Sequence, residues 1–280
     1  MKHIFFALLS LLSLCAFGQS GRLFTVDKEL SNSNVNAIYQ DHTGVIWIAT
    51  EDGLDKYDGA KFTIYKHDES NRNSLLDNCV YALYSDNQGH LLVGTSCGLQ
   101  YYDAATDKFK EIPLLYSNGI NMHARIKSII QRRNGEILVG TSGHGIFIIH
   151  FSGNYPIAIQ SKLPIPTLFI EYLFEDKAQN LWIATDSKGL FRLNHTTNRM
   201  QAYFISGKDA WEDITQLCQD GQGLIYACSS DGLYMYNIAR NDFYKIYDRL
   251  FINLPINTIY PFNVNELYLG TTGHGIKVYD

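Results

Sequence analysis

Short runs in which apolar and polar residues alternate recur along the whole chain. Examples are VNAIYQ from Val35, IWIAT from Ile46 and FTIYKH from Phe62. A period of two is typical of half-buried β-strands, and Tyr, Phe and β-branched residues are the types that strands prefer. Turn sequences such as Asp41-His42-Thr43-Gly44 separate the runs, as expected for hairpins. The pattern has no convincing helical periodicity and predicts an all-β fold.

One phrase occurs six times and defines a repeat. The copies are VIWIATEDGLDKYD from Val45, HLLVGTSCGLQYYD from His90, EILVGTSGHGIFII from Glu136, NLWIATDSKGLFRL from Asn180, LIYACSSDGLYMYN from Leu224 and ELYLGTTGHGIKVYD from Glu266. Their equivalent hydroxyl residues are Thr50, Thr95, Thr141, Thr185, Ser229 and Thr271, so the steps are 45, 46, 44, 44 and 42 residues. Each unit parses as four short strands. Four-stranded units of about 40 to 50 residues predict a β-propeller, whereas linear β-solenoids have shorter repeats.

Both ends of the repeat region fall inside a unit. RLFTVDK, residues 22–28, looks like the fourth strand of a unit when compared with KFTIYKH from Lys61. The sixth unit stops at Asp280, where its own fourth strand would begin. Pairing of these two segments would close a ring of six blades. Alternatively, the chain holds six blades of a truncated seven-bladed ring, and the sequence leaves both arrangements open.

The N-terminal residues predict export. Lys2 precedes an apolar run from Ile4 to Leu14, and a small-x-small cleavage site follows at 16–18. We therefore predict a secretory signal peptide at residues 1–18 and the propeller at residues 19–280. A membrane anchor is the weaker interpretation, because the apolar run is shorter than the ~20 residues that cross a bilayer.

Charge and cysteine content narrow the chemistry. The chain has 23 Lys and Arg against 28 Asp and Glu without a basic block, which argues against a nucleic-acid partner. Export permits disulfides, and Cys79 falls opposite Ser96, one residue out of register with Cys97, so a bond between Cys79 and Cys97 stays open. Cys218 and Cys228 lie well out of register and are predicted to be small buried residues.

Stacking the six units singles out one polar position in the first strand. Its members are Asn36, Tyr81, Lys127, Glu171, Thr215 and Asn257. The apolar sites around it are Val35, Val80, Ile126, Ile170, Ile214 and Ile256, then Ile38, Leu83, Ile129, Leu173, Leu217 and Ile259. Because the apolar sites must pack between blades, we expect the polar set to face the central channel, with Lys127 and Glu171 as neighbours. Alternatively, this ring only satisfies buried polar groups of a structural channel.

Loops leading into the first strands are the other candidates for a binding site, since rigid scaffolds carry binding residues on loops. A saccharide needs aromatic faces beside hydrogen-bonding groups. Two such loops hold Tyr116, Asn121, His123 and Arg125, and Lys208, Asp209 and Trp211. Trp211 is the best single candidate, because Trp47 and Trp182 occupy a strand position of the repeat and are expected in the core. A Trp that packs under its own loop is an equal alternative.

The repeated Gly-His-Gly phrase does not predict a metal site. His144 and His274 lie three units apart, nearly opposite each other in a ring, so they are interpreted as exposed loop residues. Asp, Glu and His are scattered over the loops without metal spacing. The sequence predicts no metal ligand, no cofactor and no catalytic residue in this region.

The units resemble the two-component regulator propeller repeats, most clearly in IWIATEDGLDKYD and the preceding LSNSNVNAIYQDHTG. The resemblance covers all six units, although the fifth has Ala227-Cys228-Ser229 where the others have Ala or Gly followed by Thr. In that family such repeats build the periplasmic sensor region of hybrid two-component systems of Bacteroidetes. Those receptors detect oligosaccharides from polysaccharide breakdown and induce the genes for their use.

The resemblance implies partners outside this chain. These are an oligosaccharide ligand, a second propeller, a histidine kinase on an inner-membrane anchor, and a second copy in a homodimer. Two alternatives remain: a secreted propeller lyase or hydrolase that would use Lys127, Glu171 or His123, and a structural propeller whose ligand binds elsewhere. The enzyme is disfavoured, because no nucleophile–base motif and no carboxylate pair stand out by spacing.

Overall fold

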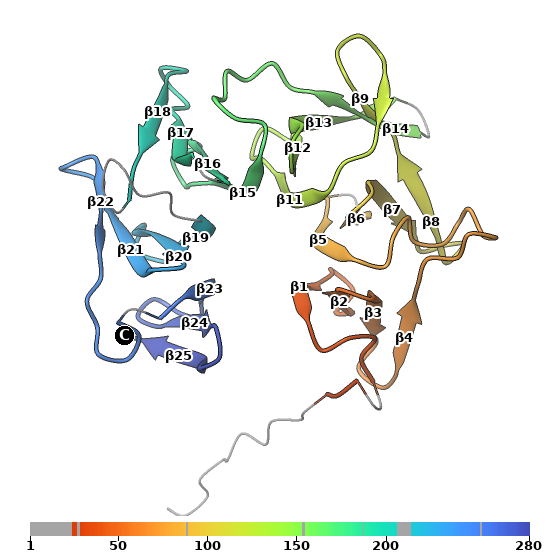
Figure 1. Ribbon diagram of the computed structural model, residues 1–280, viewed down its shortest axis with the longest axis horizontal. Helices are drawn as coiled ribbons and strands as arrows, with labels where there is room; N and C mark the ends of the chain where they lie inside the picture. Colours follow the sequence, from red (N-terminus) through yellow and green to blue (C-terminus); the bar gives the residue numbers. More distant parts are fainter. Residues whose placement is uncertain are drawn as a thin grey trace, which may run out of the picture.

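The computed structural model describes residues 24–26, 29–87, 89–152, 155–186, 188–205, 214–252 and 254–280. In these residues every regular element is a β-strand, and the strands form six sheets around a central axis (Figure 1). The chain is therefore a six-bladed β-propeller, which confirms the predicted fold class. The predicted signal peptide lies outside the described residues.

The blades follow one another in chain order. Blade 1 has β1 (Val35–Gln40), β2 (Ile46–Thr50), β3 (Gly53–Tyr57) and β4 (Phe62–Tyr65). Blade 2 has β5 (Val80–Ser85), β6 (Leu91–Thr95), β7 (Leu99–Asp103) and β8 (Lys108–Ile112). Blade 3 has β9 (Leu114–Leu115), β10 (Asn121–Met122), β11 (Ile126–Gln131), β12 (Ile137–Thr141), β13 (Gly145–Ser152) and β14 (Tyr155–Gln160).

The second half repeats the plan. Blade 4 has β15 (Ile170–Glu175), β16 (Leu181–Thr185), β17 (Gly189–Leu193) and β18 (Met200–Tyr203). Blade 5 has β19 (Ile214–Gln219), β20 (Ile225–Ser229), β21 (Gly232–Asn237) and β22 (Asp242–Lys245). Blade 6 has β23 (Ile256–Pro261), β24 (Leu267–Thr271) and β25 (Gly275–Tyr279). The strands β1, β5, β11, β15, β19 and β23 lie nearest the axis (Figure 1).

Blades 3 and 6 depart from the four-stranded plan. The sequence predicts a loop at residues 114–125, but β9 and β10 form a hairpin whose strand β9 runs parallel to the outer strand β14. The hairpin extends blade 3 outward because Leu114 is buried in the cluster between blades 2 and 3. Blade 6 has three strands among the described residues, and none of those in the segment 22–28 pairs with β25.

Apolar side chains between neighbouring blades make up the core. Within the described residues they form five clusters, and each cluster joins one blade to the next. Trp47 and Trp182 lie in two of these clusters, as predicted, and are almost fully buried. The predicted apolar sites of the first strands are buried in blades 2 to 6. In blade 1 the prediction is wrong, since Val35 and Ile38 are exposed where no described blade covers them.

A β-bulge lies at the same place in all six blades. The pairing of the first and second strands shifts register one residue after Val35, Val80, Ile126, Ile170, Ile214 and Ile256. The residue left out of register is the predicted polar one in every blade, for example Lys127 between Ile126 and Ser128. A bulge re-aims one side chain of a strand. The bulge thereby keeps the apolar residues on both sides of it on the same face of the blade. The polar side chain between them points away from the interface with the neighbouring blade.

Candidate functional site

Charged and aromatic side chains meet at the inner strands of blades 2, 3 and 4. Lys127 Nζ lies 2.7 Å from Glu171 Oε2, and both side chains are 24% exposed. The ring of Tyr81 has the Arg125 guanidinium carbon 5.1 Å and Lys127 Nζ 5.5 Å from its centroid. The predicted contact between Lys127 and Glu171 is confirmed. We call Tyr81, Arg125, Lys127 and Glu171 the central cluster.

The phenol of Tyr81 stays protonated at neutral pH. A hydrogen bond with the Cys79 side chain, together with burial, raises the pKa of Tyr81 to about 12, although Arg125 opposes the shift. Tyr81 therefore offers the central cluster a neutral hydroxyl and an aromatic face. Cation–π contacts of this kind also fix the ring, because two cations lie on it.

Two other members of the polar ring bind backbone of the neighbouring blade, whereas Asn257 Oδ1 accepts a hydrogen bond from Thr272 Oγ1 of its own blade at 3.2 Å. Asn36 Nδ2 donates to Val80 O at 2.8 Å, and Thr215 Oγ1 donates to Ile256 O at 3.1 Å. Each bond joins one blade to the bulge of the next blade. At these two positions the polar side chain has a structural role, because it donates a hydrogen bond to a backbone carbonyl group, as the alternative interpretation of the ring predicts. The central cluster is thus confined to one arc of the ring.

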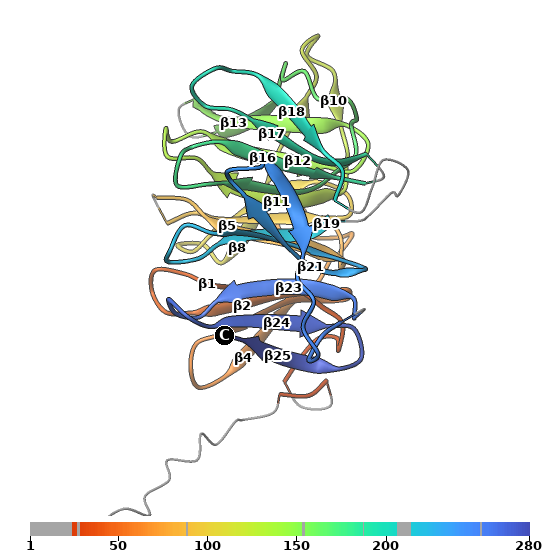
Figure 2. The same cartoon turned by 90° about the vertical axis from the view of Figure 1, so that its left-hand side faces the viewer.

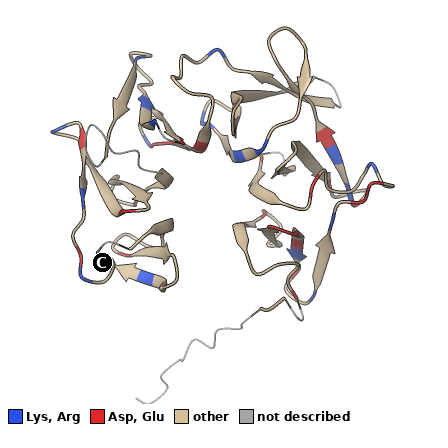
Figure 3. Cartoon of the chain, viewed as in Figure 1, with Lys and Arg blue, Asp and Glu red and all other residues tan. Residues whose placement is uncertain are grey.

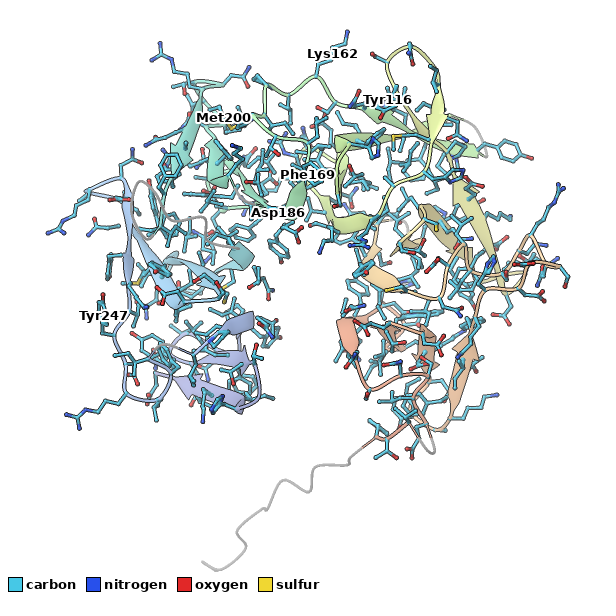
Figure 4. All side chains as sticks on the ribbon, viewed as in Figure 1. Tyr116, Lys162, Phe169, Asp186, Met200 and Tyr247 are labelled. Atoms are coloured by element: carbon cyan, nitrogen blue, oxygen red, sulfur yellow. The ribbon has the colours of Figure 1, made fainter. Side chains whose placement is uncertain are left out.

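The loop residues predicted as one site are divided by the fold. Arg125 joins the central cluster, whereas Tyr116 lies at the outer edge of blade 3 (Figure 4). The Tyr116 hydroxyl and His144 Nδ1 form a hydrogen bond, so His144 is half-buried and not the exposed loop residue that the sequence predicts. Asn121 and His123 are exposed. Lys208, Asp209 and Trp211 lie outside the described residues.

A hollow between the outer parts of blades 2 and 3 is absent from the sequence predictions. Its volume is about 890 Å³. Its lining includes His90, Tyr101, Asp103, Lys110, Phe151 and Tyr155. We call this site the rim hollow. It combines three aromatic rings, Tyr101, Phe151 and Tyr155, with two charged groups, Asp103 and Lys110. In the sequence, this site is visible only as aromatic residues in the third and fourth strands of blades 2 and 3. Aromatic residues are common in strands, so they do not by themselves indicate a binding site.

Contacts within the rim hollow hold its polar groups in place. His90 Nδ1 lies 2.9 Å from Asp86 Oδ2, and its ring stacks on Phe151 with centroids 6.1 Å apart. Lys110 Nζ lies 2.7 Å from Asp103 Oδ2 and 5.6 Å from the centroid of Tyr101. Hydrogen bonds from Lys110 and then Thr106 lower the pKa of Asp103 to about 2. The rim hollow therefore presents the rings of Phe151 and Tyr101, each in contact with a neighbouring side chain, and the ionised carboxylate of Asp103.

The cysteines are free in the described residues. Cys97 Sγ donates to Asp77 Oδ2 at 3.4 Å, so Cys79 and Cys97 form no disulfide. Cys218 and Cys228 are buried, as predicted, and burial raises the pKa of Cys218 to about 12.

Other kinds of site are missing from the part of the chain that the structure describes. No three His, Cys, Asp or Glu side chains gather there as metal ligands. The same residues contain no helix long and apolar enough to span a membrane. Acidic and basic residues are interspersed around the ring of described residues (Figure 3).

The fold and the repeats place this protein in the class of β-propellers built from sequence repeats. Comparison with known sequences shows which repeat family two of the units match. Residues 29–52 and 74–97 match the family described as two component regulator propeller. Histidine kinase P4 of Formosa agariphila is 42% identical over 52 residues, which are 19% of this chain and 4% of that protein. The first and second repeat units therefore match the two-component regulator propeller family, which confirms the resemblance for those two units.

Solved structures share the fold. An extracellular domain of a hybrid two component system from B. thetaiotaomicron is 23% identical with a TM-score of 0.77, over 92% of this chain and 35% of that one. A second from the same organism is 20% identical with a TM-score of 0.76, over 92% and 37%. Virginiamycin B lyase from Staphylococcus aureus is 14% identical with a TM-score of 0.62, over 90% and 86%. The chain spans about a third of the two-component domains it matches.

Proposed function

We propose that this chain is a ligand-sensing propeller in the extracytoplasmic region of a hybrid two-component sensor, and that its ligand is an oligosaccharide. The observation that carries the proposal is the match of two repeats to the two-component regulator propeller family. Similarity to a histidine kinase points to the same context. The propeller itself contributes binding and no catalysis.

The rim hollow supports the choice of ligand. A sugar ring has apolar C–H groups on its faces and hydroxyls around its rim. One face therefore stacks on Tyr101 or Phe151, while the hydroxyls donate hydrogen bonds to Asp103 and accept them from Lys110. The central cluster has similar chemistry, and both sites contain an ion pair, Lys127 with Glu171 and Lys110 with Asp103. The rim hollow is the first site to test, because its side chains line a hollow of about 890 Å³. Trp211, Lys208 and Asp209 stay candidates on their own loop.

Binding would reach the kinase through the rest of the receptor. A ligand shifts an equilibrium only if it binds one state more tightly than the other. We propose that saccharide capture favours one arrangement of a receptor homodimer, in which the second propeller and the kinase are further partners. The expected result is altered expression of polysaccharide-utilisation genes.

The test is calorimetric titration of residues 19–280 with a panel of oligosaccharides. We expect Tyr101→Ala and Phe151→Ala each to weaken binding roughly tenfold, because each removes one stacking face. Tyr244→Ala is the matched control, since Tyr244 is an exposed outer-strand tyrosine of blade 5. Binding that survives both substitutions excludes the rim hollow, and no binding by any saccharide excludes the proposed ligand class. Turnover of a saccharide would favour the alternative of a propeller lyase or hydrolase.

A further inference from the structure

A smaller hollow lies beside the rim hollow, between the outer parts of blades 1 and 2. Its volume is about 320 Å³. Its lining includes Lys56, Asp58, Lys61, Thr63, Tyr65 and Asp107. We call it the second hollow. Tyr102 and Ala104 line both hollows, so only the end of β7 and the turn at residues 104–107 separate the two.

The second hollow contains a cation held by aromatic rings. Lys56 Nζ lies 5.2 Å from the centroid of Trp47 and 5.1 Å from that of Tyr102, and it donates to the Tyr102 hydroxyl at 3.0 Å. The hydroxyls of Tyr102 and Tyr65 both donate to Asp107 Oδ1. These contacts hold the Lys56 ammonium and the Asp107 carboxylate in place.

Blades 4 and 5 contain the same arrangement across the ring (Figures 1 and 2). The strand register and the turn position show that Arg192, Gln201 and Asn241 stand there in place of Lys56, Thr63 and Asp107. Arg192 Nη1 donates to the Tyr236 hydroxyl. Arg192 Nη2 donates to Gln201 Oε1 at 3.3 Å and to Asn241 Oδ1 at 3.1 Å. In this copy the protein's own side chains use the polar groups.

The copy in blades 1 and 2 has shorter side chains and leaves polar atoms for a ligand. An ammonium group has three hydrogens, and within the described residues Lys56 Nζ donates one hydrogen bond, to Tyr102. In the same residues Asp107 accepts hydrogen bonds at Oδ1 and none at Oδ2. The bonds from Tyr102 and then Tyr65 lower the pKa of Asp107. The second hollow therefore has a fixed donor beside a fixed, ionised acceptor.

Charges in the two hollows are balanced. The ionisable groups nearest the second hollow's donor and acceptor are two lysines and two aspartates, Lys56, Lys61, Asp58 and Asp107. In the rim hollow Lys110 is paired with Asp103, and His90 with Asp86. A uronate or a sulfated sugar would need a surplus of cations. Neighbouring hydroxyls of an uncharged sugar fit instead, because one donates to a carboxylate while the other accepts from an ammonium group.

We propose that the second hollow is a further subsite of the rim hollow, and that the ligand is an uncharged oligosaccharide long enough to pass over Ala104 and occupy both. One sugar unit stacks in the rim hollow, and a later unit places its hydroxyls on Lys56 Nζ and Asp107 Oδ2. Both hollows have volumes in the range of about 300 to 1,000 Å³ that ligand sites occupy. This inference rests on the proposed function, because it extends the ligand proposed there.

The experiment is calorimetric titration of residues 19–280 with uncharged cello-, xylo-, manno- and malto-oligosaccharides, each from the disaccharide to the hexasaccharide. For the series that binds, we expect affinity to rise roughly tenfold once the saccharide spans both hollows, because hydrogen bonds to two charged groups are added. Lys56→Arg combined with Thr63→Gln copies the arrangement of blade 4 and should remove this gain. Asp107→Asn, which copies Asn241, should reduce it. Lys66→Arg, at a lysine outside both hollows, is the matched control and should keep it.

The outcomes separate this inference from the proposed function. Binding that does not strengthen with saccharide length would overturn the second subsite and leave the rim hollow as a site. A gain with length that persists in Lys56→Arg with Thr63→Gln, in a variant whose thermal unfolding shows it to be folded, would also overturn it. Tighter binding of a uronate or sulfated saccharide of equal length would refute the uncharged ligand. Failure of every saccharide to bind would overturn the proposed function and this inference together.

Discussion

At the turn between the first and second strands of a blade, one aspartate side chain accepts several hydrogen bonds. Trp182 Nε1 donates to Asp176 Oδ2 at 2.8 Å, and Trp47 Nε1 donates to Asp41 Oδ2 at 2.9 Å. The backbone N–H groups of Asn180 and Val45 donate to the other oxygen of the same carboxylates. One residue therefore closes the turn and orients the largest core side chain of its blade.

Replacing Trp182 by Phe should destabilise the chain by about 2 kcal/mol, because a buried hydrogen bond to a carboxylate is lost and the ring is smaller. Chemical unfolding measures the free energy. Tyr244→Phe, at an exposed tyrosine, is the control and should change little. An unchanged midpoint for Trp182→Phe would mean that the indole bond to Asp176 contributes nothing.

The same turn predicts a pH dependence. Burial alone would raise the pKa of Asp41, but hydrogen bonds from Thr43, Trp47 and Val45 outweigh it and hold the pKa below its ordinary value of 3.8. A lowered folded-state pKa stabilises the fold above pH 3.8, and this stabilisation is lost as the pH falls through the folded-state pKa.

Asp41→Asn should therefore be less stable than the native chain at neutral pH, and the difference should shrink below pH 3.8. Urea unfolding at several pH values measures it. Asp186→Asn, at an exposed aspartate (Figure 4), is the control. A difference that is constant with pH would contradict the assignment of the shift to Asp41.

Between elements, small residues set how closely blades approach. A Cβ added to Gly94 on β6 would lie 2.6 Å from Ile126 Cγ2 of blade 3. In blades 1 and 4 the equivalent residues are Ala49 and Ala184, and in blade 5 the equivalent residue is Cys228. The small residue at this position of the repeat is thus a packing residue that sets how closely the next blade approaches.

Gly94→Ala should cost about 1–3 kcal/mol, since the neighbouring strand must move to admit the methyl group. Gly221→Ala is the matched control, because its Cβ would lie 3.4 Å from Val264, an ordinary contact. Thermal unfolding compares the two. Equal losses of stability in the two variants would show that the close contact of β6 with blade 3 does not exclude a larger side chain at Gly94.

The ion pair of the central cluster joins β11 to β15. Because both side chains are partly exposed, the ion pair should contribute little to the free energy of unfolding. A double-mutant cycle of Lys127→Met and Glu171→Gln should give a coupling energy of about 1 kcal/mol or less, and this energy should decrease as salt is added. A coupling of zero at low salt would show that the bulges place these side chains together without energetic benefit.

For the whole molecule, stability should be lowest where an interface is missing. A repeat protein is stabilised by the contacts between neighbouring units, and blades 1 and 6 each have one described neighbour while blades 2 to 5 have two. We expect faster hydrogen exchange in β2 and β24 than in β12 and β16, the equivalent strands of blades 3 and 4. Uniform exchange through the six blades would instead indicate a ring that unfolds as one unit.

The repeat, the strands and the class of fold all follow from the amino-acid sequence. Period-two alternation depends only on residues that are close in the sequence, so it predicts the strands. A regular spacing of equivalent Thr and Ser residues is compatible with few repeat architectures, so it predicts the fold class. The same alignment identified the polar position of the first strand and the contact of Lys127 with Glu171, because one position in neighbouring blades must be adjacent in a ring.

Which residues share a site follows from the folded arrangement and not from the sequence. Tyr116 and Arg125 are near in sequence, yet a hairpin carries the first outward and a bulge region holds the second inward. Tyr101 and Phe151 are remote in sequence and meet in the rim hollow. Exposure of Ile38 and Ile276 also needed the fold, because a sequence pattern marks a residue as apolar but says nothing about whether a neighbouring blade covers it.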